Sequence, residues 1–296
     1  MSAGDLYAIG SGIIWSFSVI LMRISGLTIP ALPLTFFKVT FSVLCFALVL
    51  AIRPDQWVSG LSGQDYLRLI FSAILGITIA DTMIASALNR LGASLHALAD
   101  CAYTPAMAMI GFLMFGEVLT VPEFIGGALV VSGVFVGATV TKEVKNSRDL
   151  WIGVFLAAAA HVIMALGILL VRDIFTEHSI VWVSGFRFLC AAIAMALIVL
   201  VTTPKQFSEK LLLGYRHPET WKTMIPMSIL GPFLATMLWT AGFKYLTAGR
   251  AAIFNQLSTV FIILLAYLLL GEKFTPRKAI GTALALMGSI LVAINR

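Results

Sequence analysis

The chain has 296 residues, of which 60% are hydrophobic and 11% charged, with a mean hydropathy of +1.00. A soluble domain is about half apolar and about a quarter charged, so this chain lacks the polar surface to cover a water-facing protein. The composition predicts an integral membrane protein in contact with the lipid bilayer and leaves no room for a separate soluble domain. The net charge of +6 comes mainly from short loops between apolar runs, where basic residues anchor helices, so nucleic acid is not expected as a partner.

The first residues and the cysteines exclude several further classes. Met-Ser-Ala-Gly-Asp contains no basic region ahead of the first apolar run, so we expect a retained helix and no cleaved signal peptide. Cys45, Cys101 and Cys190 lie inside apolar runs without metal-ligand spacing, so we expect neither disulfides nor a metal site. The sequence has no nucleophile elbow, metalloprotease motif or phosphate-binding loop. We therefore expect no enzyme activity, no cofactor and no ATP-driven transport by this chain alone.

Ten apolar segments are long enough to cross a bilayer, which requires about twenty residues. Because lipid offers no hydrogen-bond partners to the backbone, these segments must be helical. The breaks between them carry loop residues, such as Arg53-Pro54-Asp55 and Thr203-Pro204-Lys205. The sequence predicts an all-α integral membrane protein with ten transmembrane helices, at 5–25, 31–52, 66–88, 92–115, 121–140, 149–171, 180–202, 221–243, 250–270 and 276–295.

The second half of the sequence repeats the first. A shift of 155 residues superposes Gly116-Glu117 on Gly271-Glu272, and a shift of 149 superposes Phe37-Lys38 on Phe186-Arg187. Each unit has an odd number of helices, so the second unit must cross the membrane in the opposite sense. Inverted repeats are a plan of secondary transporters, with the substrate site near the midplane where the halves meet. We predict two inverted five-helix units, 1–140 and 149–296.

The repeated segments resemble a known family. Gly116-Glu117, Gly126 and Gly133, with their counterparts Gly271-Glu272, Gly281 and Gly288, are similar to the end of the EamA repeat of the drug/metabolite transporter superfamily. The basic residues Lys38 and Arg187 at the start of the second helix of each half fit the same family. The resemblance covers essentially the whole chain and implies a bacterial exporter in the inner membrane. It leaves the solute open, since similar members export amino acids, carry nucleotide sugars or extrude drugs.

Two structural roles follow from the same repeated residues. The glycine pairs Gly126/Gly133 and Gly281/Gly288 are seven residues apart, which predicts close contact between helices. Glu117 and Glu272 recur at one place in the two halves, so we expect a role in the fold, holding the turn that follows.

The basic residues do not fix the orientation of the chain. Lysine and arginine are more frequent in the odd-numbered loops, which by the positive-inside rule places both termini outside. The family resemblance implies termini in the cytoplasm. The sequence therefore leaves orientation, direction of transport and oligomeric state open.

Five ionisable residues lie inside the predicted spans, where charges are costly and are candidates for function. Asp81 and Asp100 each lie about nine residues from the turn at Arg90, which places both roughly 13 Å below one membrane face at about 1.5 Å per residue. Lys38 enters from the same face to a depth of roughly 10 Å. We expect these three charges to act together. The full set is Lys38, Asp81, Asp100, His161 and Arg187.

Two interpretations of these charges remain open. In the first they line a cavity, where Asp100 and Asp81 hold a substrate ammonium or exchange a proton, and Lys38 and Arg187 bind a carboxylate. In the second Lys38 neutralises one aspartate and the pair only fixes helix packing. His161 is either a cavity or proton-relay group or a hydrogen-bonded packing residue. His96, near a helix start, is expected to be solvated.

Further polar, aromatic and proline residues mark the predicted pathway through helices 66–88, 92–115, 221–243 and 250–270. Asn255 and Gln256 lie at the depth of Asp100, and aromatic rings attract an amine cation. A proline inside a span frees a carbonyl and kinks the helix, which is tolerated where protein or a cavity satisfies that carbonyl. The aromatic candidates are Trp15, Phe17, Tyr103 and Trp239, and the helix-break candidates are Pro105, Pro226 and Pro232.

The sequence predicts a secondary transporter that exports amino acids or similar small zwitterions by alternating access, with protons as a candidate partner. A mixed set of acidic and basic residues favours a zwitterion over an apolar drug. Drugs, nucleobases and opine-like metallophores are the alternative solutes. A more remote alternative is a membrane accessory protein that transports nothing.

Overall fold

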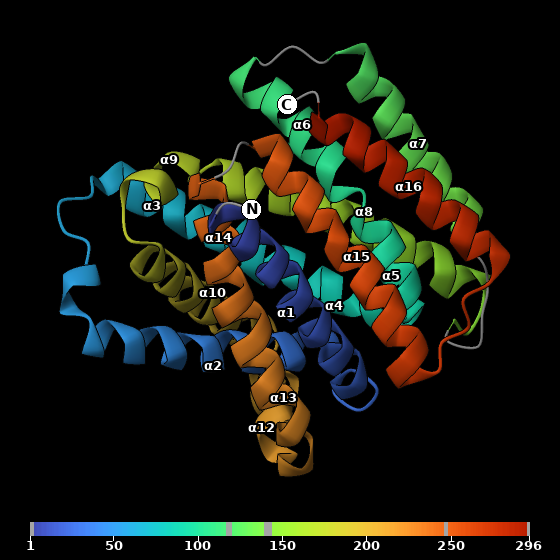
Figure 1. Cartoon of the computed structure of the whole chain (residues 1–296). Coiled ribbons are helices and arrows are strands. Elements are labelled where there is room, and N and C mark those ends of the chain that lie inside the picture. The colour runs from blue at the N-terminus through green and yellow to red at the C-terminus, as the bar shows by residue number, and fades with distance from the viewer. Residues whose placement is uncertain (1–2, 117–119, 139–143, 246–247, 295–296) are drawn as a thin grey trace.

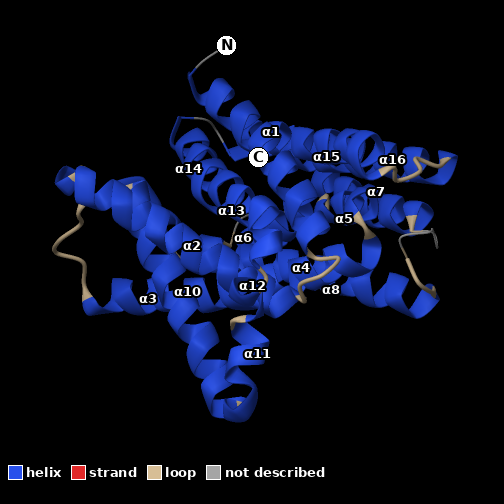
Figure 2. Cartoon of the chain, turned by 90° about the horizontal axis from the view of Figure 1, so that it is seen from below, coloured by secondary structure: helices blue, strands red, loops and turns tan. Residues whose placement is uncertain are grey.

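Within residues 3–116, 120–138, 144–245 and 248–294, which the computed structural model describes, every regular element is helical (Figures 1 and 2). Seven helical stretches are long and apolar enough to cross a membrane, and 121–137 and 257–270 are shorter apolar helices. These findings confirm the all-α membrane protein. The number of ten transmembrane helices stays a prediction.

The helices follow the predicted spans closely. The first half contains α1 (Ala3–Ser25), α2 (Ala31–Ile52), η1 (Pro54–Gln56), α3 (Gly63–Ala73), η2 (Ile74–Ile79), α4 (Ala80–Leu91), α5 (Ala93–Asp100), α6 (Tyr103–Phe115) and α7 (Val121–Gly137). The second half contains α8 (Ser147–Leu169), α9 (Arg172–Glu177), α10 (Ile180–Thr202), η3 (Pro204–Gln206), α11 (Phe207–Leu211), α12 (Leu213–Arg216), η4 (Pro218–Thr220), α13 (Trp221–Ser228), η5 (Ile229–Ala235), α14 (Thr236–Tyr245), α15 (Ala248–Leu270) and α16 (Pro276–Ile294).

Outward-facing apolar side chains recur at helical spacing along the long helices. On α2, Leu44, Leu48 and Ile52 are each more than 60% exposed and lie four residues apart. This spacing places them on one helix face, as expected for a surface covered by lipid tails. The main buried apolar cluster, which includes Ile20, Phe37 and Leu88, packs between α1, α2 and α4.

The third span of each half contains a wider helical turn at the same place. The segments η2 and η5 are π-helical and begin at residues 74 and 229, which are related by the shift of 155 found in the sequence. Segments of π-helix are rare and often occur at functional sites. The coincidence supports the two-unit organisation with boundaries 1–140 and 149–296, which stays a prediction.

Pro232 explains part of the wide turn in η5. A proline has no N–H to bond the carbonyl four or five residues earlier, here Ser228 or Met227. The carbonyl of Met227 accepts a hydrogen bond from Ser18 Oγ at 2.9 Å, and that of Ser228 accepts one from Ser42 Oγ at 3.3 Å. Serines of α1 and α2 thus satisfy the backbone as expected. Pro226 lies within α13, which continues through it.

The predicted span 92–115 is present as one apolar stretch, Ala93–Met114, which the structure interrupts at Cys101–Ala102, between α5 and α6. The reason is Pro105, which cannot bond the carbonyl of Cys101. That carbonyl instead accepts a hydrogen bond from Ser289 Oγ of α16 at 3.2 Å. The break places Asp100 at the last turn of α5 and Tyr103 at the first turn of α6.

The helices α7 and α16 lie side by side in both views (Figures 1 and 2). A Cβ atom on Gly126 would lie 2.6 Å from the carbonyl oxygen of Gly288, and one on Gly133 would lie 2.5 Å from that of Gly281. Only glycine allows backbones to approach this closely. The close contact predicted from the paired glycines is confirmed.

Glu272 has a structural role, but not the one predicted. Its carboxylate accepts hydrogen bonds from the backbone N–H groups of Ala93 (2.7 Å) and Ser94 (2.8 Å), at the start of α5. These groups have no partner within the helix, and a negative charge is favourable at a helix N-terminus. Glu272 therefore fixes the start of the helix that carries Asp100, and not the turn after itself. Glu117 lies outside the described residues.

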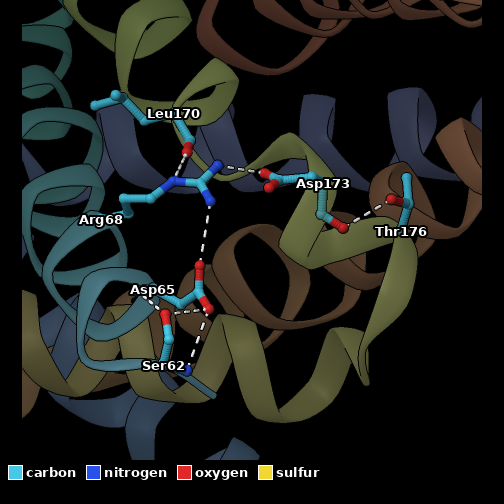
Figure 3. Close-up of polar contacts among 6 residues, drawn as sticks. All are labelled: Ser62, Asp65, Arg68, Leu170, Asp173 and Thr176. Carbon is cyan, nitrogen blue, oxygen red and sulfur yellow. Dashed lines mark hydrogen bonds and ion pairs between the residues drawn. The ribbon is translucent and has the colours of Figure 1, made fainter.

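The helix α8 is fastened to the third span at both ends. At one end Arg90 of α4 forms an ion pair with Asp149 of α8. At the other, Arg68 of α3 donates to the carbonyl of Leu170 at 2.9 Å, and its guanidinium also pairs with Asp173 of α9 (Figure 3). Ser62 and Asp65 cap the start of α3 next to Arg68, which also contacts Asp65 at 3.2 Å. These contacts join α3 and α4 to α8 at both ends of α8.

The glycine contact predicts the effect of a single methyl group. Gly126→Ala should destabilise the protein by about 1–3 kcal/mol, because the new Cβ overlaps the backbone of α16. Gly127→Ala is the matched control, since its Cβ would meet only Pro105 Cβ at 3.7 Å. Thermal unfolding in detergent measures both variants, and equal melting temperatures for the two would contradict the close contact.

The Arg68–Asp173 ion pair predicts a pH dependence of stability. Hydrogen bonding to Arg68 lowers the pKa of Asp173 below its usual value. The pair therefore stabilises the fold above the unfolded pKa of about 3.9, and this contribution is lost as pH falls through the lower folded pKa. We expect the melting-temperature difference between wild type and Asp173→Asn to be small, since Asp173 is half exposed, and to vanish on acidification. A difference that persists after full acidification, or in an Arg68→Gln background, would contradict this account.

Candidate functional site

The structure contains a cavity of about 180 Å³ between the helices of both halves. Helices α1, α2, α4, α8 and α10 contribute to its wall, together with η2, η5 and the junction of α5 with α6. Nine residues predicted from the sequence line it: Trp15, Lys38, Asp81, Asp100, Tyr103, His161, Arg187, Pro232 and Trp239.

The remaining predicted residues are not part of this lining. Pro105 and Pro226 lie in α6 and α13 away from the cavity wall. The side chains of Asn255 and Gln256 lie outside the described part of the structure, although both residues belong to α15.

Lys38 and Asp81 form a buried ion pair. Lys38 Nζ lies 2.8 Å from Asp81 Oδ2, and the two residues are 2% and 8% exposed. Burial of two charges is tolerated when each neutralises the other at close range. The geometry is that of the second interpretation, in which Lys38 neutralises one aspartate. Because its charge is matched, Lys38 is not a free binding group for a carboxylate.

Arg187 is a buried cation without an ion-pair partner among the described residues. It projects from α10, is 7% exposed, and its guanidinium carbon lies 5.4 Å from the centre of the Phe175 ring. Its Nε has no hydrogen-bond partner in the described structure. Gly76 of η2 leaves room for the guanidinium, since a Cβ there would lie 3.3 Å from Nη2. An unpaired buried arginine in a cavity is a candidate anion-binding group.

Asp100 is separate from the Lys38–Asp81 pair and has two histidines beside it. His96 Nδ1, one turn earlier on α5, lies 3.2 Å from Asp100 Oδ1, and His161 Nε2 of α8 lies 3.3 Å from the same atom. The expected joint action of Lys38, Asp81 and Asp100 is thus divided into two groups, a matched pair and a histidine-flanked carboxylate. The prediction that His96 is solvated is wrong, because this residue is 1% exposed.

Tyr103 lines the same cavity and contacts His161. Its ring packs edge-on against His161 with the ring centres 5.9 Å apart, and its hydroxyl has no hydrogen-bond partner in the described structure. Asp81 and Tyr103 are also close enough to Arg187 to interact with it electrostatically. A buried hydroxyl without a partner is costly unless a ligand or water supplies one.

Sequence reasoning missed several lining residues that the repeat itself identifies. The shift of 155 carries Asp81 to Thr236, Ile84 to Trp239 and Tyr103 to Ser258, and all six side chains line the cavity. His96 could have been found from its position four residues before Asp100, which places both on one helix face.

This arrangement defines a multi-pass membrane protein with a charged cavity between helices, the class to which membrane transporters belong. The EamA-like transporter family matches residues 2–138 and 151–294. The chain therefore belongs to the EamA-like transporter family, and with it to the drug/metabolite transporter superfamily.

Similar proteins agree with this assignment. A protein of Archaeoglobus fulgidus described as an uncharacterized transporter is 24% identical over 293 residues, covering 98% of this chain and 97% of that protein. Another of Methanothermobacter thermautotrophicus, with the same description, is 22% identical over 253 residues, covering 82% of this chain and 69% of that protein. A solved structure described as the crystal structure of a protein has a TM-score of 0.68 at 18% identity, covering 100% of this chain and 98% of that one, and shows the fold alone.

The Lys38–Asp81 pair predicts that two substitutions are less harmful than one. Lys38→Ala leaves Asp81 as an uncompensated buried charge, which should cost about 3–5 kcal/mol. Adding Asp81→Asn removes that charge and should restore much of the stability. A double-mutant cycle on thermal unfolding tests this coupling, and additive losses would show that the two residues act independently.

Proposed function

We propose that this protein is a secondary transporter that exports amino acids or similar small zwitterions across the bacterial inner membrane by alternating access. The observation that carries the proposal is the distribution of charge in the cavity. Arg187 offers an unmatched positive charge, and Asp100 offers a carboxylate from a different helix. A zwitterion carries the two complementary groups in one small molecule.

The carboxylate of the solute pairs with Arg187. Arginine binds carboxylates through two parallel hydrogen bonds, and Tyr103 can donate a third from its unpartnered hydroxyl. These contacts would give hydrogen-bond partners to Arg187 Nε and to the Tyr103 hydroxyl, two of the buried polar atoms that have none in the described structure. Lys38 does not take part, because Asp81 already holds it at 2.8 Å.

The ammonium group of the solute pairs with Asp100. This carboxylate lines the cavity and remains 19% exposed, whereas the two histidines beside it are 8% exposed or less. Trp15 and Trp239 also line the cavity, and aromatic ring faces attract ammonium groups at short range.

The size of the cavity favours small metabolites over the alternative solutes. Sites for drug-sized ligands have volumes of about 300–1,000 Å³, whereas this cavity has about 180 Å³. Drugs and metallophores are therefore less well matched than an amino acid. A nucleobase is small enough but lacks the two opposite charges that Arg187 and Asp100 would pair.

Transport by purified protein in proteoliposomes tests the proposal. The panel contains radiolabelled L-serine, L-alanine, L-glutamine, putrescine and uracil, each measured with and without an imposed pH gradient. Carriage of the amino acids, and neither putrescine nor uracil, is the expected result. Movement of uracil alone, or of none of the panel, would contradict the zwitterion and favour the nucleobase or drug alternative.

Substitutions of Asp100 and Arg187 test whether each residue binds one charged group of the solute. Asp100→Asn should abolish amino-acid transport in a folded protein, because the amide cannot neutralise the ammonium group. Arg187→Gln should do the same through loss of the carboxylate contact. Asp55→Asn, in an exposed loop, is the matched control and should transport as wild type does. Normal uptake by a well-folded Asp100→Asn protein would remove Asp100 from the mechanism.

A further inference from the structure

The hydrogen bonds of His161 fix where its protons lie. His161 Nδ1 is 2.6 Å from the carbonyl oxygen of Ala157, one turn earlier on α8. A carbonyl oxygen only accepts hydrogen bonds, so Nδ1 must carry a proton and donate it. In a neutral imidazole the other nitrogen is then a bare acceptor.

That other nitrogen, Nε2, faces a second acceptor. It lies 3.3 Å from Asp100 Oδ1, and an ionised carboxylate oxygen also only accepts. Asp100 Oδ1 has no hydrogen-bond partner in the described structure, and a bare nitrogen beside an ionised carboxylate at this distance is an unfavourable pair that one proton would relieve. The proton resides either on Nε2, giving an imidazolium beside a carboxylate, or on the carboxyl, which then donates to Nε2. His96 Nδ1 lies 3.2 Å from Asp100 Oδ1 without forming a hydrogen bond to it, and it supplies no proton to His161 Nε2.

The other charged groups around the cavity do not supply this proton. Lys38 and Asp81 neutralise each other at 2.8 Å, and Arg187 interacts with Asp81 and Tyr103. Tyr103 of α6 packs against His161 through its ring. Helices α1 and α14 bring Ser11, Trp15 and Trp239 to the lining, and the described side chains of α15 bring Ser258, so none of these adds a titratable group.

We propose that Asp100 and His161 together form the proton-binding site of the transport cycle, and that the ammonium group of the solute competes with that proton for Asp100 Oδ1. The proposal rests on the proposed transport of a zwitterion. When the ammonium binds, its N–H groups donate to the ionised carboxylate and to the bare Nε2, so the shared proton must leave. Each cycle then moves one solute out and one proton in.

The shared proton is tested first without any solute. The full-length protein, with ¹⁵N-labelled histidine, is studied in lipid nanodiscs at pH 7, and His161→Gln identifies the His161 signals. Infrared difference spectra between wild type and Asp100→Asn report the Asp100 carboxyl, with Asp173→Asn as the matched control. We expect either a protonated Nε2 with an ionised carboxylate or a bare Nε2 with a protonated carboxyl. A bare Nε2 beside an ionised carboxylate, or a proton on each group, would overturn the assignment.

Competition between proton and solute is tested by transport. The probe is radiolabelled L-serine, or the member of the amino-acid panel with the fastest exchange, with the membrane potential clamped at zero. One proton per solute supports about tenfold accumulation for each unit of pH gradient. His161→Gln should lose this accumulation. Its solute exchange should fall less, as a fraction of the wild-type rate, than its accumulation does. His217→Gln, at an exposed histidine, is the control and should accumulate as wild type does.

The outcomes separate this inference from the proposed function. If no amino acid moves but the shared proton is present, the solute assignment fails and the proton site stands. If amino acids move and His161→Gln still accumulates them about tenfold per pH unit, the proton site is wrong and the zwitterion transporter stands.

Discussion

The absence of water from the bilayer core is the constraint on which the rest of this structure depends. A charge or a free backbone group in that environment must find a partner inside the protein. Lys38 and Asp81 meet this requirement within the chain, as do the carbonyls freed by Pro105 and Pro232. Arg187 and the hydroxyl of Tyr103 do not meet it within the described residues. Both line one cavity, where a bound solute can supply the missing partners.

The breaks in the helices determine where these groups lie. Pro105 divides α5 from α6, so that Asp100 and Tyr103 both turn toward the cavity from one interrupted span. Glu272, from the other half of the chain, holds the first N–H groups of α5 and thereby fixes the helix that carries Asp100. The group of α3, α4 and α8, joined by these contacts, carries His161 and Asp81 on the side that lines the cavity. A change in how α5 sits against that group would alter the distance between Asp100 and His161.

Much of the fold and of the site lining follows from the sequence, and particular residues show why the rest does not. Span lengths and the spacing of Gly126 and Gly133 are local patterns, so helix positions and the α7–α16 contact could be predicted. The depth of Asp81, Asp100 and Lys38 placed all three at one level, and the structure has them in one cavity. Lys38 and its partner Asp81 are 43 residues apart in the sequence. Which aspartate pairs with Lys38 depends on the rotation of each helix about its axis and on the reach of the side chains, and depth alone defines neither. The burial of His96 likewise follows from packing of α5 between α8 and α15, whereas the local sequence indicates only that His96 and Asp100 share a helix face.

The charges of the proposed cycle determine where the membrane potential acts. Lys38 and Asp81 sum to zero in every state, and Asp100 with His161 sums to zero while they share a proton. With Arg187 the proton-loaded cavity then carries one positive charge. A bound zwitterion adds no net charge but expels the proton, so Asp100 becomes negative and the solute-loaded cavity is neutral. Moving one elementary charge across a potential of 100 mV changes its free energy by about 2.3 kcal/mol. The potential would therefore drive the return of the proton-loaded carrier and would not affect the neutral, solute-loaded step. In this proposed cycle, the arginine that would bind the solute carboxylate is therefore also the reason that the proton-loaded, solute-free carrier would move with the membrane potential.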